Sequence, residues 1–322
     1  AYGEQLLDWL NTYTFPCERQ FADKAHADEV ADIFIKELLR NGTTTALVFG
    51  SVHPQSVNSF FEAAEQLDLR MIAGKVMMDR NAPDYLTDTA ESGYQESKAL
   101  IERWHGKGRL HYAVTPRFAP TSTPEQLTLA GKLLGEYPDL YMQTHISENK
   151  QEVEWVKELF PERKGYLDVY DHYKLLGERS VFAHGVHLCD DECARLAETG
   201  SAVAFCPTSN FFLGSGLFNL PMAEKHKLNV GLGTDVGAGT SFSMLQTLNE
   251  GYKVQQLQGE KLSAQEGLYQ ATLGGARALQ LEDKLGNFLP GKEADFVVLN
   301  WAATPLQQLR MDNATSLDER LF

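Results

Sequence analysis

The sequence is poor in cysteine, in basic residues and in long apolar runs, and each shortage argues against a class of protein. Its four cysteines include no Cys-x-x-Cys pair, so we expect reduced thiols and a cytoplasmic location. Lysine and arginine total 29 against 44 aspartates and glutamates, giving a formal charge of −15. This balance argues against nucleic acid as a partner, because phosphate contacts need clustered basic residues, and it suits a neutral or cationic small molecule. No apolar run approaches the roughly 18 residues of a membrane-spanning helix, and no signal peptide is visible, so we expect no membrane partner.

Composition and length are otherwise those of an ordinary globular protein. Hydrophobic residues make up 43% and charged residues 23% of 322 positions. That length allows two average domains or one large α/β barrel, which takes about 250 residues. Ala1 is not an initiator methionine, and the chain stops at Phe322 without a cap or polar tail. We therefore expect the sequence to be a piece of a longer protein.

Strand and helix patterns alternate along most of the chain. Repeated β–α units imply parallel pairing with right-handed crossovers, hence either a doubly wound sheet or a closed barrel. We favour a (β/α)₈ TIM-type barrel, because seven strands are one short of eight and the first strand would precede the start of the chain. The predicted strands cover residues 43–49, 70–78, 110–114, 140–144, 180–183, 202–206 and 229–233.

The C-terminal part has a different pattern. It is helical from 244 to about 279, and residues 286–299 then form a turn-rich entry to a short strand. We expect this strand to begin a small β-sandwich domain. The predicted division is a barrel that lacks its first strand over 1–285 and a partial β-sandwich over 286–322.

One strand end carries a histidine and a carboxylate. Residues 140–144 lead to His145 and, three residues on, Glu148. A neutral imidazole can bind Zn²⁺ or Fe²⁺, and a nearby unligated carboxylate can take a proton from the metal's water. A partly buried histidine beside a solvated glutamate at a helix start would give the same pattern. The choice depends on the other strand ends.

Two further strands end in potential metal ligands. His184 ends the strand over 180–183, and Asp235 follows the strand over 229–233. Asp235 alone could equally be a helix cap. In parallel α/β folds, however, function collects at the C-terminal ends of the strands. His145, His184 and Asp235 from three separate strands suit a divalent transition metal.

Another strand end offers groups for a flat polar ligand. Arg117 and Phe118 follow the strand over 110–114 and supply a bidentate donor and an aromatic face. His53, after the strand over 43–49, could line the same pocket. We assign structural or surface positions to the remaining histidines considered, which are His105, His111, His172, His187 and His226.

Taken together, these motifs resemble the amidohydrolase superfamily and, within it, the guanine deaminases. The matching stretches occur in family order over nearly the whole chain, and Thr-Pro-Arg-Phe-Ala-Pro at 115–120 is the one that narrows the resemblance. They lie at 115–120, 144–149, 182–185, 205–210, 230–236, 272–276 and 291–295.

The resemblance implies a metal site and a set of roles. It implies one Zn²⁺ per subunit, with Fe²⁺ as the alternative, bound by His145, Asp235 and two histidines of a His-x-His motif on the first strand. No His-x-His occurs in the sequence, so those two ligands are expected before Ala1. Glu148 would be the general base and acid, and His184 would orient the water or the oxyanion. Asp235 would share the proton transfer, and His145, His184 and Asp235 would also border the substrate.

The implied reaction is hydrolysis of the C2 amino group of guanine to xanthine and ammonia, a step of purine catabolism, in a homodimer. Arg117 and the backbone at Phe118 would hold the purine through its carbonyl and ring nitrogens. One alternative is deamination of another amino-heterocycle of triazine, pterin, cytosine or adenosine type. Another is a non-catalytic scaffold relative, although such proteins lose the site residues that this sequence keeps. The zinc deaminases with a Pro-Cys-x-x-Cys motif are excluded, because Cys206-Pro207 has the reverse order.

Overall fold

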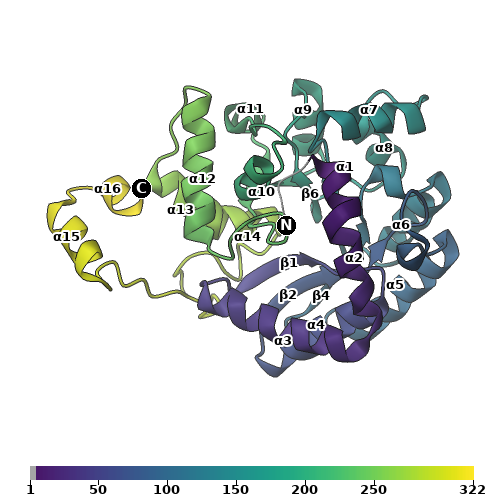
Figure 1. Ribbon diagram of the computed structural model, residues 1–322, viewed down its shortest axis with the longest axis horizontal. Coiled ribbons are helices and arrows are strands. Elements are labelled where there is room, and N and C mark those ends of the chain that lie inside the picture. Colours follow the sequence, from purple (N-terminus) through teal and green to yellow (C-terminus); the bar gives the residue numbers. More distant parts are fainter. Residues whose placement is uncertain (1–4) are drawn as a thin grey trace.

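The computed structural model describes residues 5–322 and contains a curved parallel sheet with helices packed on its outer side (Figure 1). All seven predicted strand regions form strands, in the order β1-β2-β4-β5-β6-β7-β8. The short strand β3 continues the second region and pairs with β4. The bounds are β1 Thr45–Phe49, β2 Arg70–Gly74, β3 Val76–Met77, β4 His111–Pro116, β5 Tyr141–Ile146, β6 Ser180–His184, β7 Ala202–Phe205 and β8 Asn229–Leu232.

The sheet is an open barrel. Among the described residues, β1 pairs only with β2 and β8 pairs only with β7, so these two strands are the free edges. Every pairing is parallel, which brings the C-terminal ends of the strands to one rim. The TIM-type fold is therefore confirmed, as a half-barrel with an opening between its first and last strands.

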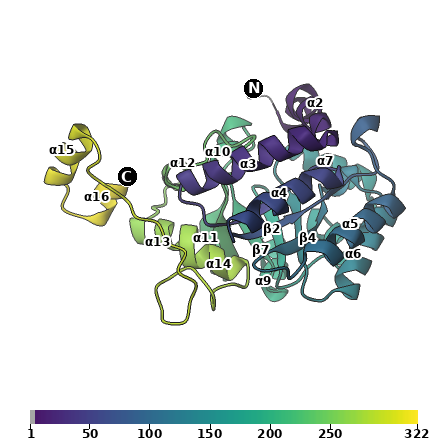
Figure 2. The same cartoon turned by 90° about the horizontal axis from the view of Figure 1, so that it is seen from below.

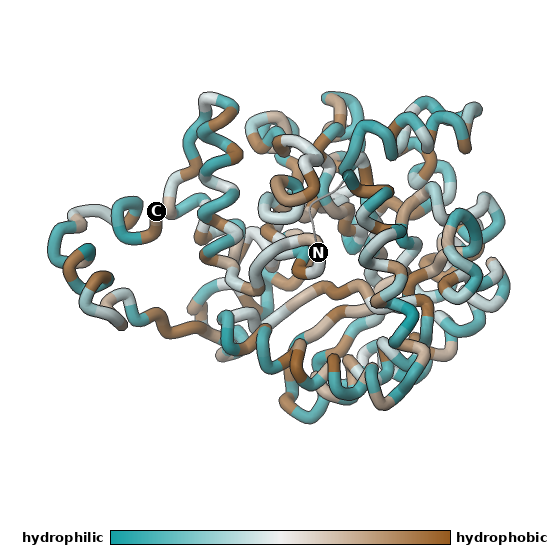
Figure 3. The backbone as a smooth tube through the Cα atoms, viewed as in Figure 1, coloured by the Kyte–Doolittle hydropathy of each residue, from teal (hydrophilic) through white to brown (hydrophobic). Residues whose placement is uncertain are grey.

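The helices cover the outer face of the sheet and bury its apolar side chains. Figures 2 and 3 show this layer, with α3 and α4 side by side and the hydrophobic residues concentrated along the strands. Many helices begin at the polar caps that their sequences predict; Thr123, for example, accepts the backbone N–H of Gln126. The helices are α3 Lys24–Arg40, α4 Pro54–Gln66, η3 Asp84–Leu86, α5 Ala90–Trp104, η4 Ala119–Thr121, α6 Pro124–Glu136, α7 Lys150–Leu159, α8 Tyr166–His172, α9 Asp190–Glu198, α10 Pro207–Phe212, α11 Leu220–Lys225 and α12 Met244–Leu257.

An N-terminal helical segment packs against the rim of the barrel. It consists of α1 (Leu6–Trp9), a π-helical turn η1 (Leu10–Thr14), α2 (Phe15–Glu18) and a 3₁₀ turn η2 (Arg19–Ala22). Its buried apolar residues share a core cluster with Phe118 from the end of β4. Pro16 lies in the first turn of α2, where its missing backbone N–H costs no helical hydrogen bond.

The C-terminal part departs from the sequence prediction. After α13 (Ala264–Tyr269), η5 (Gln270–Gly274) and α14 (Gly275–Ala278), no strand forms over 286–299 in the described chain. A strand needs a pairing partner, and none lies beside this segment. Its apolar side chains stay in water, with exposed fractions of 86% for Phe288 and 83% for Val298. The chain ends in α15 (Pro305–Asn313) and α16 (Leu317–Leu321), and the β-sandwich domain remains a prediction.

Ion pairs attach this C-terminal segment to the bottom of the barrel. Glu293 pairs with Arg70 at the start of β2 and with Arg109 just before β4. Asp295 also pairs with Arg109. In the part of the chain that the structure describes, no helix combines the length and apolarity needed to cross a membrane.

Candidate active site

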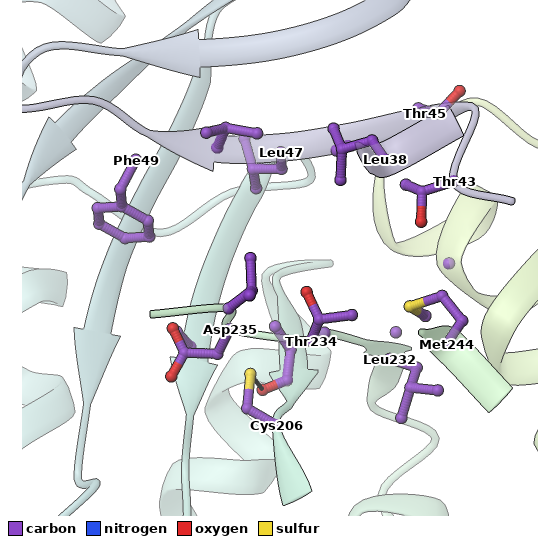
Figure 4. Close-up of a pocket in the computed structure, with 18 of the residues that line it drawn as sticks. Leu38, Thr43, Thr45, Leu47, Phe49, Cys206, Leu232, Thr234, Asp235 and Met244 are labelled. Atoms are coloured by element: carbon purple, nitrogen blue, oxygen red, sulfur yellow. Dashed lines mark hydrogen bonds between the residues drawn. The ribbon is translucent and has the colours of Figure 1, made fainter. Parts of the chain in front are cut away.

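A cavity of about 860 Å³ opens at the rim of the barrel and extends between β1 and β8. Figure 4 shows Asp235, Thr234 and Cys206 on one side of it and Leu47 and Phe49 of β1 on the other. The residues predicted for catalysis, metal and substrate all line this cavity, so the structure brings them together. They are Arg117, Phe118, His145, Glu148, His184 and Asp235.

His145 lies near the end of β5 with one ring nitrogen fixed. Its Nδ1 lies 2.7 Å from the carbonyl oxygen of Arg117, and since a carbonyl only accepts, Nδ1 carries the proton. The ring stacks on His184 and contacts Phe49, with centroids 5.4 Å and 4.4 Å away. Burial, followed by the neighbouring His184, lowers the pKa of His145 to about 3. The imidazole is therefore neutral, and its Nε2 lone pair is available to a metal.

Glu148 is a buried carboxylate at a sharp turn after β5. Ser147 has a φ of +48°, and the backbone N–H groups of Glu148 and Asn149 both donate to Oε2 of Glu152, at 2.8 and 2.9 Å. The Glu148 side chain accepts a hydrogen bond of 3.3 Å from Ser215 Oγ. Burial, reinforced by the nearby carboxylates, raises the pKa of Glu148 well above its usual value. A carboxyl group with a raised pKa holds a proton more firmly than an ordinary glutamate does, which suits a general acid and base.

His184 ends β6 and faces Glu148. Its φ of +74° turns the chain sharply at the rim. Its Nε2 lies 3.4 Å from Glu148 Oε2 and 4.0 Å from Asp235 Oδ2. Its Nδ1 contacts the amide nitrogen of Asn210 at 3.0 Å, which assigns the proton to Nε2. Burial lowers the pKa of His184 to about 3, so the ring is neutral.

A tight turn after β8 holds Asp235. The residue has a φ of +46°, and its carbonyl accepts the backbone N–H of Gly239 at 2.6 Å. A Cβ atom at Gly239 would lie 1.9 Å from the carbonyl oxygen of Thr234, so only glycine fits there. Enclosure in the cavity raises the pKa of Asp235, and His145 and Ser209 act in the opposite direction.

Arg117 and Phe118 form another part of the wall. Arg117 is 9% exposed, and its Nη1 donates to both carboxylate oxygens of Glu18, at 2.9 and 2.8 Å. Phe118 is 3% exposed and packs edge-on against Trp155, with ring centroids 6.4 Å apart. Within residues 5–322, the side-chain hydrogen bonds of Arg117 come from Nη1, and none engages Nη2 or Nε. These donors remain available to a ligand.

Sequence reasoning missed several residues at the site. Glu18 and Trp9 come from the N-terminal segment, and both line the cavity. No local pattern around these two residues shows which surface the segment covers. Asn210 was visible only as a polar residue after a strand, with no sign of its contact to His184.

His53 and His187 have structural positions. His53 is absent from the cavity lining that the structure describes; it precedes α4, and its carbonyl accepts from Ser56. The possible pocket role of His53 is therefore not supported. His187 contacts the Ser215 carbonyl through Nε2 at 2.9 Å and so supports the loop that touches Glu148.

Of the described residues, no three histidines, cysteines or carboxylates are arranged to hold a metal ion. His145 and Asp235 are the two candidate ligands that the sequence predicted, and both reach the cavity. The two further histidines expected before Ala1 stay a prediction.

Comparison with known proteins places this site in a family. The sequence matches the amidohydrolase family over residues 1–316. It is 66% identical to guanine deaminase of Escherichia coli K12 over 322 residues, which are 100% of this chain and 73% of that protein. The fold matches the structure of E. coli guanine deaminase with a TM-score of 0.98 and 66% identity, covering 100% of this chain and 74% of that chain.

A second solved structure agrees with this placement. Guanine deaminase from C. acetobutylicum, with guanine bound in its active site, gives a TM-score of 0.90 at 32% identity. That match covers 99% of this chain and 76% of the other. The chain therefore belongs to the amidohydrolase family and, within it, to the family of the guanine deaminases.

Proposed function

We propose that this chain carries the active site of a guanine deaminase, which hydrolyses the C2 amino group of guanine to give xanthine and ammonia. The observation that carries the proposal is the placement of Arg117 and Phe118 in the same cavity as Glu148, His184 and Asp235. A donor–aromatic pair for a flat ligand thus shares a cavity with proton-transfer groups. The identity of 66% with E. coli guanine deaminase supports guanine as the substrate.

The donor set fits a metal ion. Because Nδ1 of His145 donates to a carbonyl, its Nε2 presents a lone pair. Asp235 adds a carboxylate, whose Oδ2 lies 4.0 Å from Nε2 of the stacked His184. We propose that these two residues bind Zn²⁺, with Fe²⁺ as the alternative, together with two histidines that precede Ala1. Such an ion would act as a Lewis acid that lowers the pKa of water to about 7.

The substrate would be held by Arg117 and Phe118, which follow β4 and line one side of the cavity. The Nη2 and Nε groups of Arg117 are donors that suit the C6 carbonyl oxygen of guanine. Phe118 offers an apolar ring that is 3% exposed and excludes water from one side of the purine. His145, His184 and Asp235 would border the other side.

Glu148 transfers the protons of the reaction, and His184 stabilises the charge that develops. The reaction forms a C2–O bond and breaks the C2–N bond to the exocyclic amine, so both protons of the water must move. Burial raises the pKa of Glu148, so this residue can accept one proton and deliver it to a ring nitrogen. It then carries the second proton to the departing amine, with Asp235 sharing this work. The Nε2–H of His184 stabilises the negative oxygen that develops at C2.

The open sheet supports the proposed domain organisation. The cavity lies between the free edges of β1 and β8, where a further parallel strand would complete eight. We propose that residues 1–285 form a barrel that lacks its first strand and that 286–322 belong to a small β-sandwich domain. From the family resemblance we also propose that the protein is a cytoplasmic homodimer that acts in purine catabolism. Sedimentation of the full-length protein would test whether it is a dimer.

A substrate panel tests the function. The full-length protein is incubated with guanine and with amino-substituted triazine, pterin, cytosine and adenosine, and the release of ammonia is measured. We expect guanine to give the highest kcat/KM. Turnover of another heterocycle while guanine stays intact would replace the substrate assignment. A metal-free protein that releases no ammonia from any of them would favour a non-catalytic scaffold.

A further inference from the structure

The side chain of Arg117 is held by a residue that the proposed reaction does not use. Its Nη1 donates to both carboxylate oxygens of Glu18, at 2.9 Å to Oε1 and 2.8 Å to Oε2. Both side chains are largely buried, with exposed fractions of 11% for Arg117 and 18% for Glu18. Phe15, in the same helix α2, places its ring centroid 5.2 Å from the guanidinium carbon. The N-terminal segment therefore fixes the guanidinium by charge and by an aromatic face.

The backbone of Arg117 is fixed independently. Its carbonyl oxygen accepts from the His145 backbone N–H at 3.1 Å and from His145 Nδ1 at 2.7 Å. Thr144 Oγ1 donates to the same oxygen at 3.2 Å. With Glu18 holding the other end, the guanidinium has a set position relative to the His145 ring before a ligand arrives. Such preorganisation reduces the entropy that binding would otherwise cost.

The charge of the cavity gives Glu18 a second effect. Among the described residues that line the cavity, Arg117 is the single arginine or lysine, whereas Glu148 and Asp235 are acidic. A guanidinium released from Glu18 would be attracted to these two carboxylates and would compete there with a ligand.

We infer that Glu18 is a positioning residue that orients Arg117 so that its Nη2 and Nε donors select a ligand with an acceptor at the facing position. Glu18 itself does not touch the ligand. A purine with a carbonyl oxygen at C6 satisfies these donors, whereas 2,6-diaminopurine presents an amino group there and leaves them unpaired. The inference rests on the proposed function for the identity of the ligand.

A double-mutant cycle tests this inference in the full-length, metal-loaded protein. Glu18→Gln keeps the size of the side chain but removes its charge, and we expect the KM for guanine to rise about tenfold with a smaller change in kcat. The preference for guanine over 2,6-diaminopurine should fall as well. In an Arg117→Ala background, Glu18→Gln should change KM by less than about twofold, because Glu18 acts through the missing arginine.

The controls separate positioning from a general structural effect. Asp8→Asn removes the same charge from an exposed position of α1 and should leave KM unchanged. Glu18→Asp keeps the charge and should recover part of the loss. An equal effect of Glu18→Gln in both backgrounds, or an unchanged KM in the single variant, would overturn the inference.

A binding measurement keeps this inference separate from the proposed reaction. The dissociation constant of xanthine, measured by calorimetry, should follow the same cycle without any turnover. If the unsubstituted protein leaves guanine intact but the cycle appears in xanthine binding, the proposed reaction fails and the positioning role stands. If guanine is deaminated while the xanthine effects are additive, the positioning role fails alone. Absence of xanthine binding by the unsubstituted protein would overturn the inference.

Discussion

Replacement of Glu148 by glutamine should separate catalysis from folding. The amide has the shape of the carboxylate and can still accept the hydrogen bond from Ser215 Oγ, which is 3.3 Å long in the structure. It cannot accept a proton, however, and the other carboxylate beside His184, that of Asp235, lies 4.0 Å from His184 Nε2. General acid–base catalysis contributes about 10²- to 10⁴-fold, so we expect kcat to fall by that factor, or about 3–5 kcal/mol.

The same substitution should not weaken the fold. Glu148 is 2% exposed, and burial raises its pKa well above the usual value, so the ionised carboxylate is destabilising in the folded protein above its ordinary titration range. A group with a raised pKa contributes stability at low pH and loses that contribution as pH rises. In urea unfolding of the metal-stripped proteins, Glu148→Gln should therefore lose less stability than the unsubstituted protein as the pH rises above 4.5.

The assay combines three measurements on each protein. They are kcat and KM for guanine, metal content, and the free energy of unfolding after chelation. Glu154→Gln, in the exposed part of α7 with a side chain 66% exposed, is the matched control and should change none of them. Near-normal kcat in Glu148→Gln would remove this residue from the proton transfer and refute the reasoning.

Three other substitutions test separate parts of the structure. Arg117→Ala should weaken the binding of guanine by about 1–3 kcal/mol, which corresponds to a rise in KM of about 5- to 150-fold. An unchanged KM would show that the arginine does not bind the substrate. Burial raises the pKa of Glu152 from 4.5 to about 7. Protonated Glu152 therefore adds about 3 kcal/mol to the free energy of unfolding below pH 4.5, and this contribution is lost as the pH rises through 7. Glu152→Gln should flatten this dependence in urea unfolding, and a profile parallel to that of the unsubstituted protein would contradict it. Gly239→Ala would place a Cβ 1.9 Å from the Thr234 carbonyl, so the turn must shift Asp235 and metal affinity should fall about tenfold or more, as measured by competition with a chelator.

The strands and their polar ends could be predicted because their signals are local. The predicted strands are short apolar runs, and β2 is buried at all five positions, whereas β1 at the open edge of the sheet is partly buried throughout. Parallel order then places His145, His184 and Asp235 at one rim without further information. The second strand region was drawn as continuous over 70–78, but it is interrupted at Lys75. This lysine is fully buried and pairs with Asp88 at 2.6 Å, which an apolar pattern cannot reveal.

Contacts between distant segments could not be predicted. Glu18 and Arg117 are 99 positions apart, and nothing in the residues around Glu18 marks it as part of a site. The strand predicted within 286–299 failed for a related reason. Its apolar pattern was correct, but a strand forms only where another strand pairs with it, and here Phe288 and Val298 remain exposed.

We propose above all that metal-assisted hydrolysis at C2 of guanine takes place in this cavity. The most direct test incubates the full-length protein with guanine in heavy-oxygen water and analyses the purine product by mass spectrometry alongside ammonia release. We expect xanthine with one heavy oxygen at C2, one ammonia per xanthine, and loss of both products after chelation. Guanine recovered intact from a metal-loaded, folded protein would contradict it.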